Sequence, residues 1–440
     1  MKNQRLHLSF WRWHFYAAIC ITPLLITLSL SGIAYLFKEP IEDSMYKHMY
    51  FGNSGHTEKI TTDQAVNDIE NAFEGYQVTK ISYYEEASER NHRFSISNEA
   101  TGNEKYVYLD QTNHMVGSID ANNHFSNITR NFHSSLLIGG TIVNHLVELA
   151  ACWAVFLVVT GVIMSFRSKK KNGTAQVRQV QKKRHIWIGM IFSIPILLLV
   201  FSGLPWSALM GKEIGNFARE HYSLGYPALY VNPPKSDVED LPWGTQGENP
   251  PETKVEGTSL TIEQMETAVQ KRNISRPYVM KLPADETGVY TISKSSSSGI
   301  TGMDVRPSQV ITAYFNQYTG ELISKIDFHD YGVLAKWVTY GIPLHEGHLF
   351  GITNQILCLL TVLSLLALVF WGLRMWLSRK PKGRWAAPPK QRAGKEMIWV
   401  GIMMAVMGFL MPLFGISLIV ILILEALLYI IRTRDQVIAG

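Results

Sequence analysis

Long apolar segments constrain the fold of this chain more than any other feature. A helix needs about 20 apolar residues to cross a hydrocarbon core about 30 Å thick. Runs of this kind occupy residues 13–37, 136–166, 186–210 and 349–377. We expect each of them to form a membrane helix. A fifth run, 397–431, is too long for one straight crossing, and Pro412 and Gly415 interrupt it, which predicts a short C-terminal helical hairpin.

Lysine and arginine gather at one end of these runs. They precede the first run and fill the loops at 167–184 and 378–395. Because basic loops stay in the cytoplasm, we expect both termini and both loops to be cytoplasmic. The two long polar segments, 38–132 and 211–342, then lie outside, and both contain more Asp and Glu than Lys and Arg. The pattern predicts a multi-pass protein of a bacterial cytoplasmic (inner) membrane.

The first apolar run admits a second interpretation as a cleaved signal peptide, because basic residues precede it. Its apolar stretch is longer than a signal peptide needs, and no small-residue cleavage site ends it cleanly. We therefore assign it to the first membrane helix. The predicted membrane segments are 1–37, 133–166, 185–210, 343–377 and the hairpin 396–431.

Each polar segment has the pattern of a helix followed by short strands. Residues 61–73 are amphipathic and open with Thr61, a good N-cap, and residues 261–271 repeat this pattern. Alternating runs then predict strands at 78–84, 93–97, 106–109, 115–119, 278–282, 288–293, 310–315 and 322–326. The segment 226–258 is rich in Pro, Gly and Glu and is expected to be irregular. The expected fold is an α-helical membrane bundle, four core helices plus the hairpin, with two outer α+β domains.

The sequence contains an internal duplication. Residues 108–111, Tyr-Leu-Asp-Gln, correspond to residues 314–317, Tyr-Phe-Asn-Gln. In the membrane segments, histidines precede glycines by matched intervals. The pairs are His14 and Gly32, His185 and Gly203, His133 and Gly139, and His345 and Gly351. A helix–outer domain–helix unit is therefore used twice in the same orientation, and such parallel repeats are related by a pseudo-two-fold axis along the membrane normal.

Four histidines occupy equivalent positions in the two repeats. The axis makes His14 and His185 partners near the cytoplasmic face, and His133 and His345 partners near the outer face. A b-type haem takes two neutral imidazoles on opposite sides of its iron. One haem cannot bridge about 30 Å of hydrocarbon. We therefore expect two b-type haems, one held by each pair of histidines.

Glycines on the same helices fit this interpretation. At about 1.5 Å per residue, Gly32 and Gly203 lie about 27 Å from the histidines of their own helices, near the outer pair. Gly161 and Gly372 fall correspondingly near the inner pair. A missing side chain at these positions would leave room for a macrocycle.

Other interpretations of the histidines stay open. A single histidine at a membrane boundary is usually an interfacial residue, so the argument depends on four matched positions. Zinc fits poorly, because a pair of histidines lacks the third and fourth ligands of such a site. His348 has no counterpart in the first repeat and ranks behind His345, although it could replace His345 as a ligand or serve the substrate side.

Several function classes are excluded by what the sequence lacks. It contains no Cys-x-x-Cys-His, the attachment motif of c-type haem. It contains neither a Gly-x-Gly-x-x-Gly nor a Walker sequence. The electron donor must then be a separate cytoplasmic reductant or a membrane quinol, and ATP does not drive the protein. No nucleic-acid partner is expected, since the net charge of +5 averages unlike segments.

Several motifs resemble a known family, the PepSY-associated transmembrane proteins, which are often called iron-regulated membrane proteins. Residues 11–17, Trp-Arg-Trp-His-Phe-Tyr-Ala, with Ser31-Gly32 look like the first helix of that family. Residues 344–351, Leu-His-Glu-Gly-His-Leu-Phe-Gly, are similar to its fourth helix. The second and third helices resemble it at Phe132-His133, Leu136-Leu137, residues 148–150, His185 and residues 202–206. The resemblance extends over about residues 5–390, so the C-terminal hairpin lies beyond it.

This resemblance implies PepSY domains on the outside and a di-haem membrane reductase, which in some members reduces ferric siderophores. The family's haem ligands carry over to His14, His133, His185 and His345. We therefore expect a membrane ferric reductase of iron uptake, in contact with the lipid bilayer and an outer Fe(III) chelate. Two alternatives stay open. One is a regulatory PepSY protein that binds a peptide, protease or sensor kinase without redox activity, and the other is an iron-chelate transporter.

Overall fold

The computed structural model describes residues 2–166, 176–221, 224–225, 252–253, 257–379 and 397–438. The chain divides into two units, each built from separate stretches of sequence. The membrane unit contains Met1–Ile33, Asn131–Gly215 and Ile356–Gly440, and the sheet unit contains Ala34–Arg130 and Asn216–Gln355. Outside the described residues lie 167–175 and 380–395 of the predicted basic loops, and most of the segment 226–258 that we expected to be irregular.

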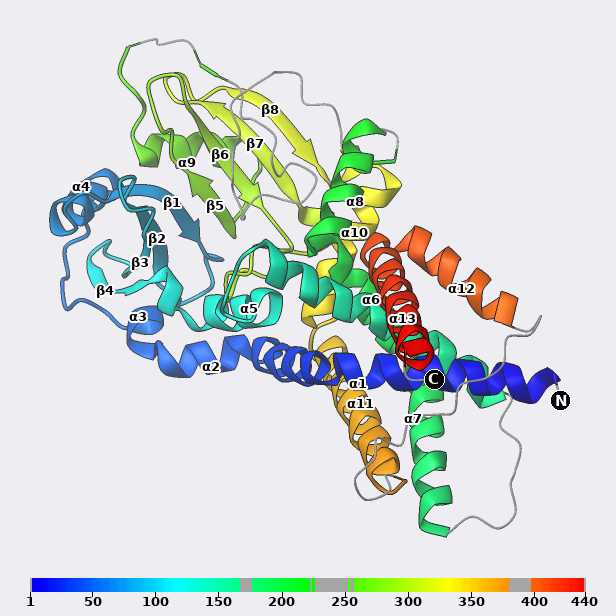
Figure 1. The fold of residues 1–440 in the computed structure, drawn as a ribbon. Helices are drawn as coiled ribbons and strands as arrows, with labels where there is room; N and C mark the ends of the chain where they lie inside the picture. Colours follow the sequence, from blue (N-terminus) through cyan, green and yellow to red (C-terminus); the bar gives the residue numbers. More distant parts are fainter. Residues whose placement is uncertain are drawn as a thin grey trace. The chain divides into compact units, whose positions relative to one another are not determined.

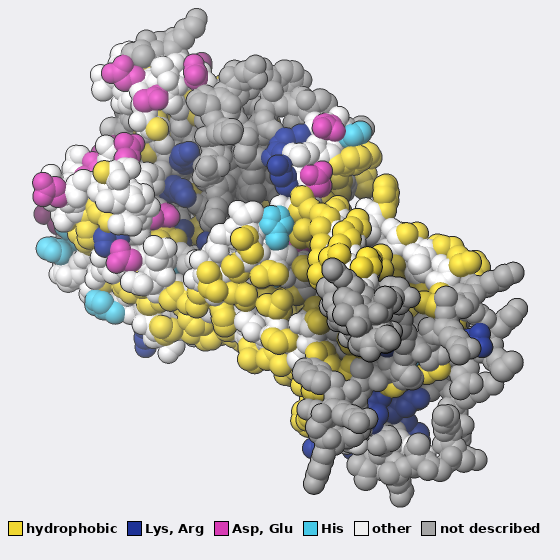
Figure 2. Space-filling model, in the orientation of Figure 1, with side chains coloured by type: hydrophobic (Ala, Val, Ile, Leu, Met, Phe, Trp, Pro, Cys, Tyr) yellow, Lys and Arg dark blue, Asp and Glu magenta, His cyan; other side chains and the backbone are white. Residues whose placement is uncertain are grey.

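Four long helices dominate the membrane unit (Figure 1). They are α1 (Lys2–Leu36), α6 (Thr141–Phe166), α7 (Gln176–Gly203) and α11 (Ile352–Leu377). Each contains a candidate membrane span by length and composition. Apolar residues lie all round these helices, and hydrophobic side chains gather on the visible surface of the unit (Figure 2), as contact with hydrocarbon requires. The chain is therefore a multi-pass membrane protein.

The predicted C-terminal hairpin is present within the membrane unit. Its helices are α12 (Met397–Leu410) and α13 (Pro412–Ile438). They approach each other backbone to backbone at the turn, because a Cβ added at Gly415 would lie only 2.7 Å from the carbonyl oxygen of Gly408. The hairpin also packs on α6, where the rings of Trp153 and Phe414 lie 4.6 Å apart between centroids. It is thus part of the core of this unit.

The structure corrects the second and fourth membrane helices. We predicted single helices over 133–166 and 343–377, but each stretch contains the end of a shorter helix, a break, and then the membrane helix. The shorter helices are α5 (Phe125–Ser135) and α10 (Val333–Glu346). Positive φ angles mark the breaks at Leu136, Leu137, Gly139, Gly140, Gly347 and Gly351. A right-handed helix cannot continue through such a backbone, and the apolar side chains within the breaks conceal them from hydropathy.

This correction moves two of the predicted site residues. His133 lies in the last turn of α5 and His345 in the last turn of α10, so neither is on a membrane helix itself. The repeat survives the change, since both histidines keep equivalent places before their breaks. The third membrane helix also ends earlier than predicted, at Gly203 rather than near residue 210. Pro205 lies two residues further on and cannot donate a helical hydrogen bond.

The two polar α+β segments join into one antiparallel sheet. Its strands are β1 (Gln77–Tyr83), β2 (His92–Ser97), β3 (Glu104–Leu109), β4 (Met115–Asp120), β5 (Tyr278–Lys281), β6 (Val289–Lys294), β7 (Ile311–Asn316) and β8 (Leu322–Asp327). All eight predicted strands are confirmed. The order β4-β3-β2-β1-β5-β6-β7-β8 places the first strand of each repeat at the centre. The sequence predicted the four strands of each repeat but not that the two groups pair into one sheet.

Shorter helices complete both units. They are α2 (Lys38–Met45), α3 (Lys47–Phe51), α4 (Thr62–Ala72), α8 (Leu209–Glu220) and α9 (Ile262–Lys271), with 3-10 turns at Ala121–Asn123, Leu204–Trp206, Pro307–Gln309 and Phe328–Asp330. The predicted N-cap is confirmed in α4, where the Thr61 side chain accepts a hydrogen bond from the Gln64 N–H. Thr261 caps α9 in the same way. The two capped helices are the equivalent helices of the two repeats.

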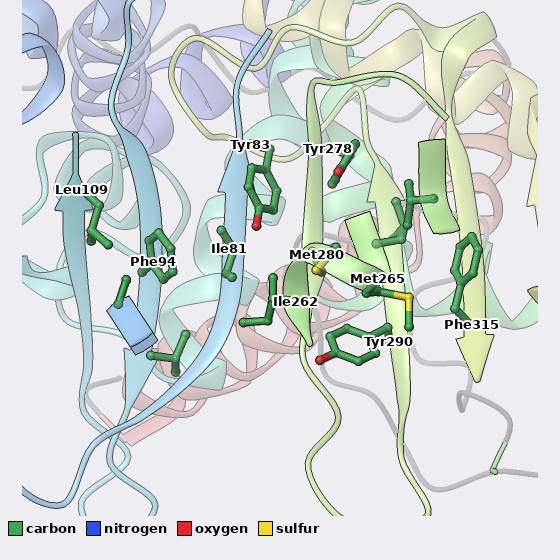
Figure 3. Packing of buried hydrophobic residues seen from close by; sticks show 14 of the residues in the cluster. Ile81, Tyr83, Phe94, Leu109, Ile262, Met265, Tyr278, Met280, Tyr290 and Phe315 are labelled. Carbon is green, nitrogen blue, oxygen red and sulfur yellow. The ribbon is translucent and has the colours of Figure 1, made fainter. Parts of the chain in front are cut away.

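The pairing of β1 with β5 puts a local two-fold axis at the centre of the sheet. Ile81 lies opposite Met280, and Lys80 lies opposite Lys281. Both α4 and α9 cover one face of the sheet and share one hydrophobic core with it. Figure 3 shows Ile81 and Met280 on the neighbouring central strands of this core. The duplication is therefore built into the packing as well as the sequence.

The first turns of α4 and α9 cap each other across this axis. The N–H of Ile262 donates to the Asp63 carboxyl at 3.0 Å, and the N–H of Thr62 donates to the Glu263 carboxylate. Carboxyl groups at helix N-termini satisfy N–H groups that have no partner within the helix. Burial, followed by the hydrogen bond with Glu263, raises the pKa of Asp63 to about 6. Burial opposes ionisation of Glu263, but hydrogen bonds from Asp63 and Thr62 lower its pKa.

A buried carboxylate fastens α2 to the rest of the sheet unit. Glu42 is 0% exposed and accepts hydrogen bonds from the Ser126 N–H at 2.7 Å and the Tyr50 hydroxyl at 3.2 Å. The hydroxyls of Ser126 and Thr301 donate to the same carboxylate. His124 Nδ1 lies 3.4 Å from it. One side chain thereby joins α2, α3, α5 and the loop after β6.

Candidate functional site

Two of the predicted histidines meet inside the membrane unit. His14 lies on α1 and His185 on α7, at equivalent positions of the two repeats. Their ring centroids are 6.4 Å apart, and the ring planes cross at 84°. The repeat predicted this pair, and the structure brings it together.

The orientation of His14 is set by a hydroxyl on another helix. His14 Nδ1 lies 2.9 Å from Thr160 Oγ1, on α6. The Thr160 hydroxyl donates its own proton to the Phe156 carbonyl at 2.7 Å. Its oxygen must then accept, so the proton of a neutral His14 belongs on Nδ1. Nε2 is left with a lone pair, the form in which an imidazole binds a metal.

A backbone carbonyl does the same for His185. The Nδ1 atom of His185 lies 3.2 Å from the Leu368 carbonyl oxygen on α11. A carbonyl can only accept, so the proton of a neutral His185 is also on Nδ1. Leu157 is the equivalent residue of the first repeat, and its carbonyl is a second hydrogen-bonding partner of His14. Both imidazoles therefore carry their lone pair on Nε2.

Glycines adjoin both rings. A Cβ added at Gly161 would lie 3.5 Å from His14 Cε1, and one added at Gly372 would lie 3.9 Å from His185 Cε1. These are ordinary van der Waals distances. Contacts with the described residues therefore do not demand glycine at either place. The predicted proximity of these glycines to the inner histidines is observed.

His133 repeats the arrangement at the other end of α1. Its Nδ1 atom lies 3.0 Å from Ser31 Oγ, and the Ser31 hydroxyl donates to the Thr27 carbonyl at 2.9 Å. A Cβ added at Gly32 would lie 3.4 Å from His133 Cε1. The Ser31-Gly32 pair thus orients and adjoins His133 as Thr160-Gly161 does His14. The predicted proximity of Gly32 to His133 is observed too.

His345, the expected partner of His133, belongs to the sheet unit, whereas His133 belongs to the membrane unit. Their pairing therefore stays a prediction. His345 lies in the last turn of α10, directly before Glu346.

His348 is placed differently from the other histidines. Its Nε2 lies 3.2 Å from Glu346 Oε2, and its Nδ1 lies 3.7 Å from Asp304 Oδ1. Both ring nitrogens of His348 therefore face carboxylates. Burial alone would raise the pKa of Glu346, but the charges of Lys38 and His348 lower it to about 2. The Lys38 ammonium lies 3.9 Å from the Glu346 carboxylate.

The donor set of the inner site fits haem better than a bare metal ion. Among the described residues, no three His, Cys, Asp or Glu side chains converge as ligands for an ion. Haem iron needs only two protein ligands, because the macrocycle supplies the other four nitrogens. His14 and His185 are such a pair. The residues present therefore fit the group.

Sequence reasoning missed the hydroxyls that orient the histidines. Ser31 and Thr160 each precede a glycine that adjoins a histidine of another helix. The Ser-Gly and Thr-Gly pairs were visible in the sequence and could have indicated these hydroxyls, but we assigned a role only to the glycines. A serine or threonine in a membrane helix usually bonds to its own helix, which concealed the second contact.

Comparison with curated proteins finds no match to this sequence. A family model described as the PepSY-associated TM region matches residues 11–379. This range includes all four histidines of the repeat and well over half of the chain. The chain therefore belongs to the PepSY-associated TM region family.

Proposed function

We propose that this protein is a di-haem b membrane oxidoreductase that passes electrons across the cytoplasmic membrane to an outer acceptor. In this proposal His14 and His185 hold the inner haem, and His133 and His345 hold the outer one. Electrons enter from a cytoplasmic reductant or a membrane quinol. The acceptor is an Fe(III) chelate of the siderophore class.

The geometry of His14 and His185 is the observation that carries this proposal. With metal–nitrogen bonds of about 2 Å, two imidazoles on opposite sides of one metal ion have centroids about 6 Å apart. The observed separation is 6.4 Å. Both histidines also have Nδ1 tied to a neighbouring helix.

The glycines beside the rings support the same conclusion. A side chain at Gly161 or Gly372 would make only ordinary contact with the imidazoles. A planar group between the helices would supply the missing reason for glycine. Membrane helices favour small residues where neighbours approach closely, and a macrocycle is such a neighbour.

Haem bound at these sites would supply one-electron transfer. The chain would hold the imidazoles in one tautomer through Thr160, Leu368 and Ser31. The apolar helices would exclude water from the group. Two sites are needed because one macrocycle cannot span about 30 Å of hydrocarbon.

The outer position of the sheet unit is part of the proposal. It rests on the lysine and arginine residues that flank the candidate spans on one side. The acceptor would then meet the protein outside the cell membrane. His348, Glu346 and Asp304 form a charged group next to the proposed ligand His345, on the same unit.

An absorption spectrum of the purified protein tests the proposal. Expressed in haem-replete cells and purified in detergent, the protein should show a Soret band and sharp α-bands after reduction. Haem extracted without covalent attachment should reach two per chain. A colourless preparation that is otherwise folded would refute the redox function and leave a binding role for the sheet unit.

A further inference from the structure

Ser31 and Thr160 share one local geometry. The Thr160 hydroxyl donates to the Phe156 carbonyl at 2.7 Å and also lies 3.2 Å from the Leu157 carbonyl. The Ser31 hydroxyl donates in the same way to Thr27 at 2.9 Å, with Leu28 at 3.1 Å. Each hydroxyl lies against the helix that carries it, three and four residues back.

Both hydroxyls are also removed from water. Thr160 is 0% exposed and Ser31 is 1% exposed. A hydroxyl has one proton and two lone pairs. Since the proton points to its own helix, the lone pairs face outwards, and the histidine Nδ1 atoms lie at 2.9 Å and 3.0 Å from these oxygens. Each hydroxyl is therefore a fixed acceptor for one imidazole N–H.

We propose that Thr160 and Ser31 are positioning residues, each of which sets the redox potential of one haem through the histidine it holds. This inference rests on the proposed function. Thr160 acts on the inner haem through His14, and Ser31 acts on the outer haem through His133. Neither residue touches the iron.

The physical effect has a definite sign. An acceptor on Nδ1–H makes the imidazole a stronger electron donor through Nε2. A stronger donor stabilises ferric iron relative to ferrous iron, which lowers the potential. Removing the acceptor should therefore raise the potential of the haem concerned. Removal of the acceptor also deletes the contact that fixes the orientation of the histidine ring.

The two ligands of the inner site are not equivalent in this respect. In the second repeat the place of Thr160 is taken by Trp371, which has no hydroxyl, and His185 relies on the Leu368 carbonyl. A side-chain substitution cannot delete a carbonyl. Side-chain control of the inner haem therefore lies on the His14 side.

Redox titration of the haem α-bands tests the proposal. Thr160→Val keeps the shape of the side chain, removes the hydroxyl acceptor and leaves His14 with the Leu157 carbonyl, whereas Thr160→Ser keeps the hydroxyl. Thr361→Val is the matched control, because Thr361 is equally buried in α11 and donates only to its own helix at Leu357 among the described contacts. A His14→Ala variant, which lacks the inner haem, identifies the band that belongs to it.

The expected result is an upward shift of the inner haem alone in Thr160→Val, with the wild-type value in Thr160→Ser and Thr361→Val. Ser31→Ala removes the hydroxyl that accepts from His133, so it should raise the potential of the outer haem alone. Unchanged potentials, equal shifts of both haems, or the same shift in Thr361→Val would overturn the inference. A wild-type protein without haem would refute the proposed function instead.

Discussion

At the residue scale, three of the four repeat histidines have a hydrogen-bond acceptor on a neighbouring helix. Thr160, Leu368 and Ser31 provide these acceptors for His14, His185 and His133. The acceptors decide which nitrogen carries the proton, and so which nitrogen can bind iron. An imidazole that faced lipid would have neither the acceptor nor the partner ring. Haem content is therefore the most direct measure of whether these contacts serve a cofactor.

Replacing one inner histidine should remove one haem. His14→Ala or His185→Ala deletes one of the two histidines proposed to hold the inner haem, and the iron would then lack a protein donor in an apolar site. We expect one haem per chain instead of two, counted as the pyridine haemochrome against protein. Loss of both haems to the same extent, or of neither, would argue against two separate sites.

The angle between the inner rings predicts a spectroscopic signature. Perpendicular imidazole planes leave two d orbitals of ferric iron nearly equal in energy, and the observed angle is 84°. A low-spin ferric haem held by these two rings, as proposed, should then give one broad signal at low field in electron paramagnetic resonance. His14→Ala should abolish this signal. A well-resolved rhombic spectrum assigned to the inner haem would show that the rings rotate away from this geometry when haem binds.

At the element scale, the alternation of apolar and polar residues was sufficient to predict the strands, and the N-cap residues were sufficient to predict the helices α4 and α9. β1 to β8 and the helices α4 and α9 all lie where the sequence placed them. The breaks before α6 and α11 could not be predicted, because Leu136 and Leu137 are apolar and yet adopt positive φ. Hydropathy records which side chains suit lipid, not which backbone angles the chain adopts. The pairing of β1 with β5 could not be predicted either, since the sequence of a strand does not identify the strand that it pairs with.

The candidate site was predictable to a similar degree. The repeat identified His14 and His185 because symmetry relates positions, whatever the contacts between them. It also led to the glycines at 161 and 372. It could not identify Thr160 as a partner of His14, since the second repeat has Trp371 at that place. A comparison of the two repeats cannot identify site residues that differ between the copies.

The carboxyl pair at the sheet axis should make stability depend on pH. The pKa of Asp63 is raised from 3.8 to about 6, so the folded state binds its proton more tightly than the unfolded state. Stability gained from this proton is present at low pH and is lost as the pH rises through about 6. In Asp63→Asn the amide group carries hydrogens that do not titrate, so stability should no longer change with pH in this range. Melting temperatures across mildly acidic to neutral pH measure the effect.

Glu263 provides the control for that experiment. Its pKa is lowered, so the stability it contributes is present at higher pH and is lost as the pH falls through its folded value. Glu263→Gln should therefore change the acid limb of the profile, whereas Asp63→Asn changes the limb towards neutral pH. Identical profiles for both variants and the wild type would mean that the two carboxyls do not share a proton.

The carboxylate of Glu42 should be essential for the sheet unit. Glu42→Ala leaves the Ser126 N–H, the Tyr50 hydroxyl and two further hydroxyls without their buried acceptor. A loss on the order of 3 kcal/mol of unfolding free energy follows from the cost of buried unsatisfied donors. Glu42→Gln keeps an acceptor oxygen and should lose less. Thermal unfolding in detergent, followed by tryptophan fluorescence, ranks the three proteins, and equal stability would show that water replaces the carboxylate.

At the scale of the whole molecule, the duplication serves the two units differently. In the sheet unit the two copies of the strands pair through β1 and β5 and make one continuous sheet. In the membrane unit the first helices of the repeats, α1 and α7, bring together one histidine from each copy. A single copy would have an open strand edge and an unpaired imidazole.

The proposed direction of electron flow separates a reductase from a transporter. We expect proteoliposomes with an enclosed reductant to reduce an external Fe(III) chelate, with the ferrous iron appearing outside, where a membrane-impermeant ferrous indicator detects it. His14→Ala should stop the reaction, because the inner haem is then missing from the only proposed path across the bilayer. A transporter would instead carry labelled chelate into the vesicle, and this uptake would survive the substitution. Accumulation of intact ferric chelate inside wild-type vesicles, without external ferrous iron, would therefore contradict the reductase and favour transport.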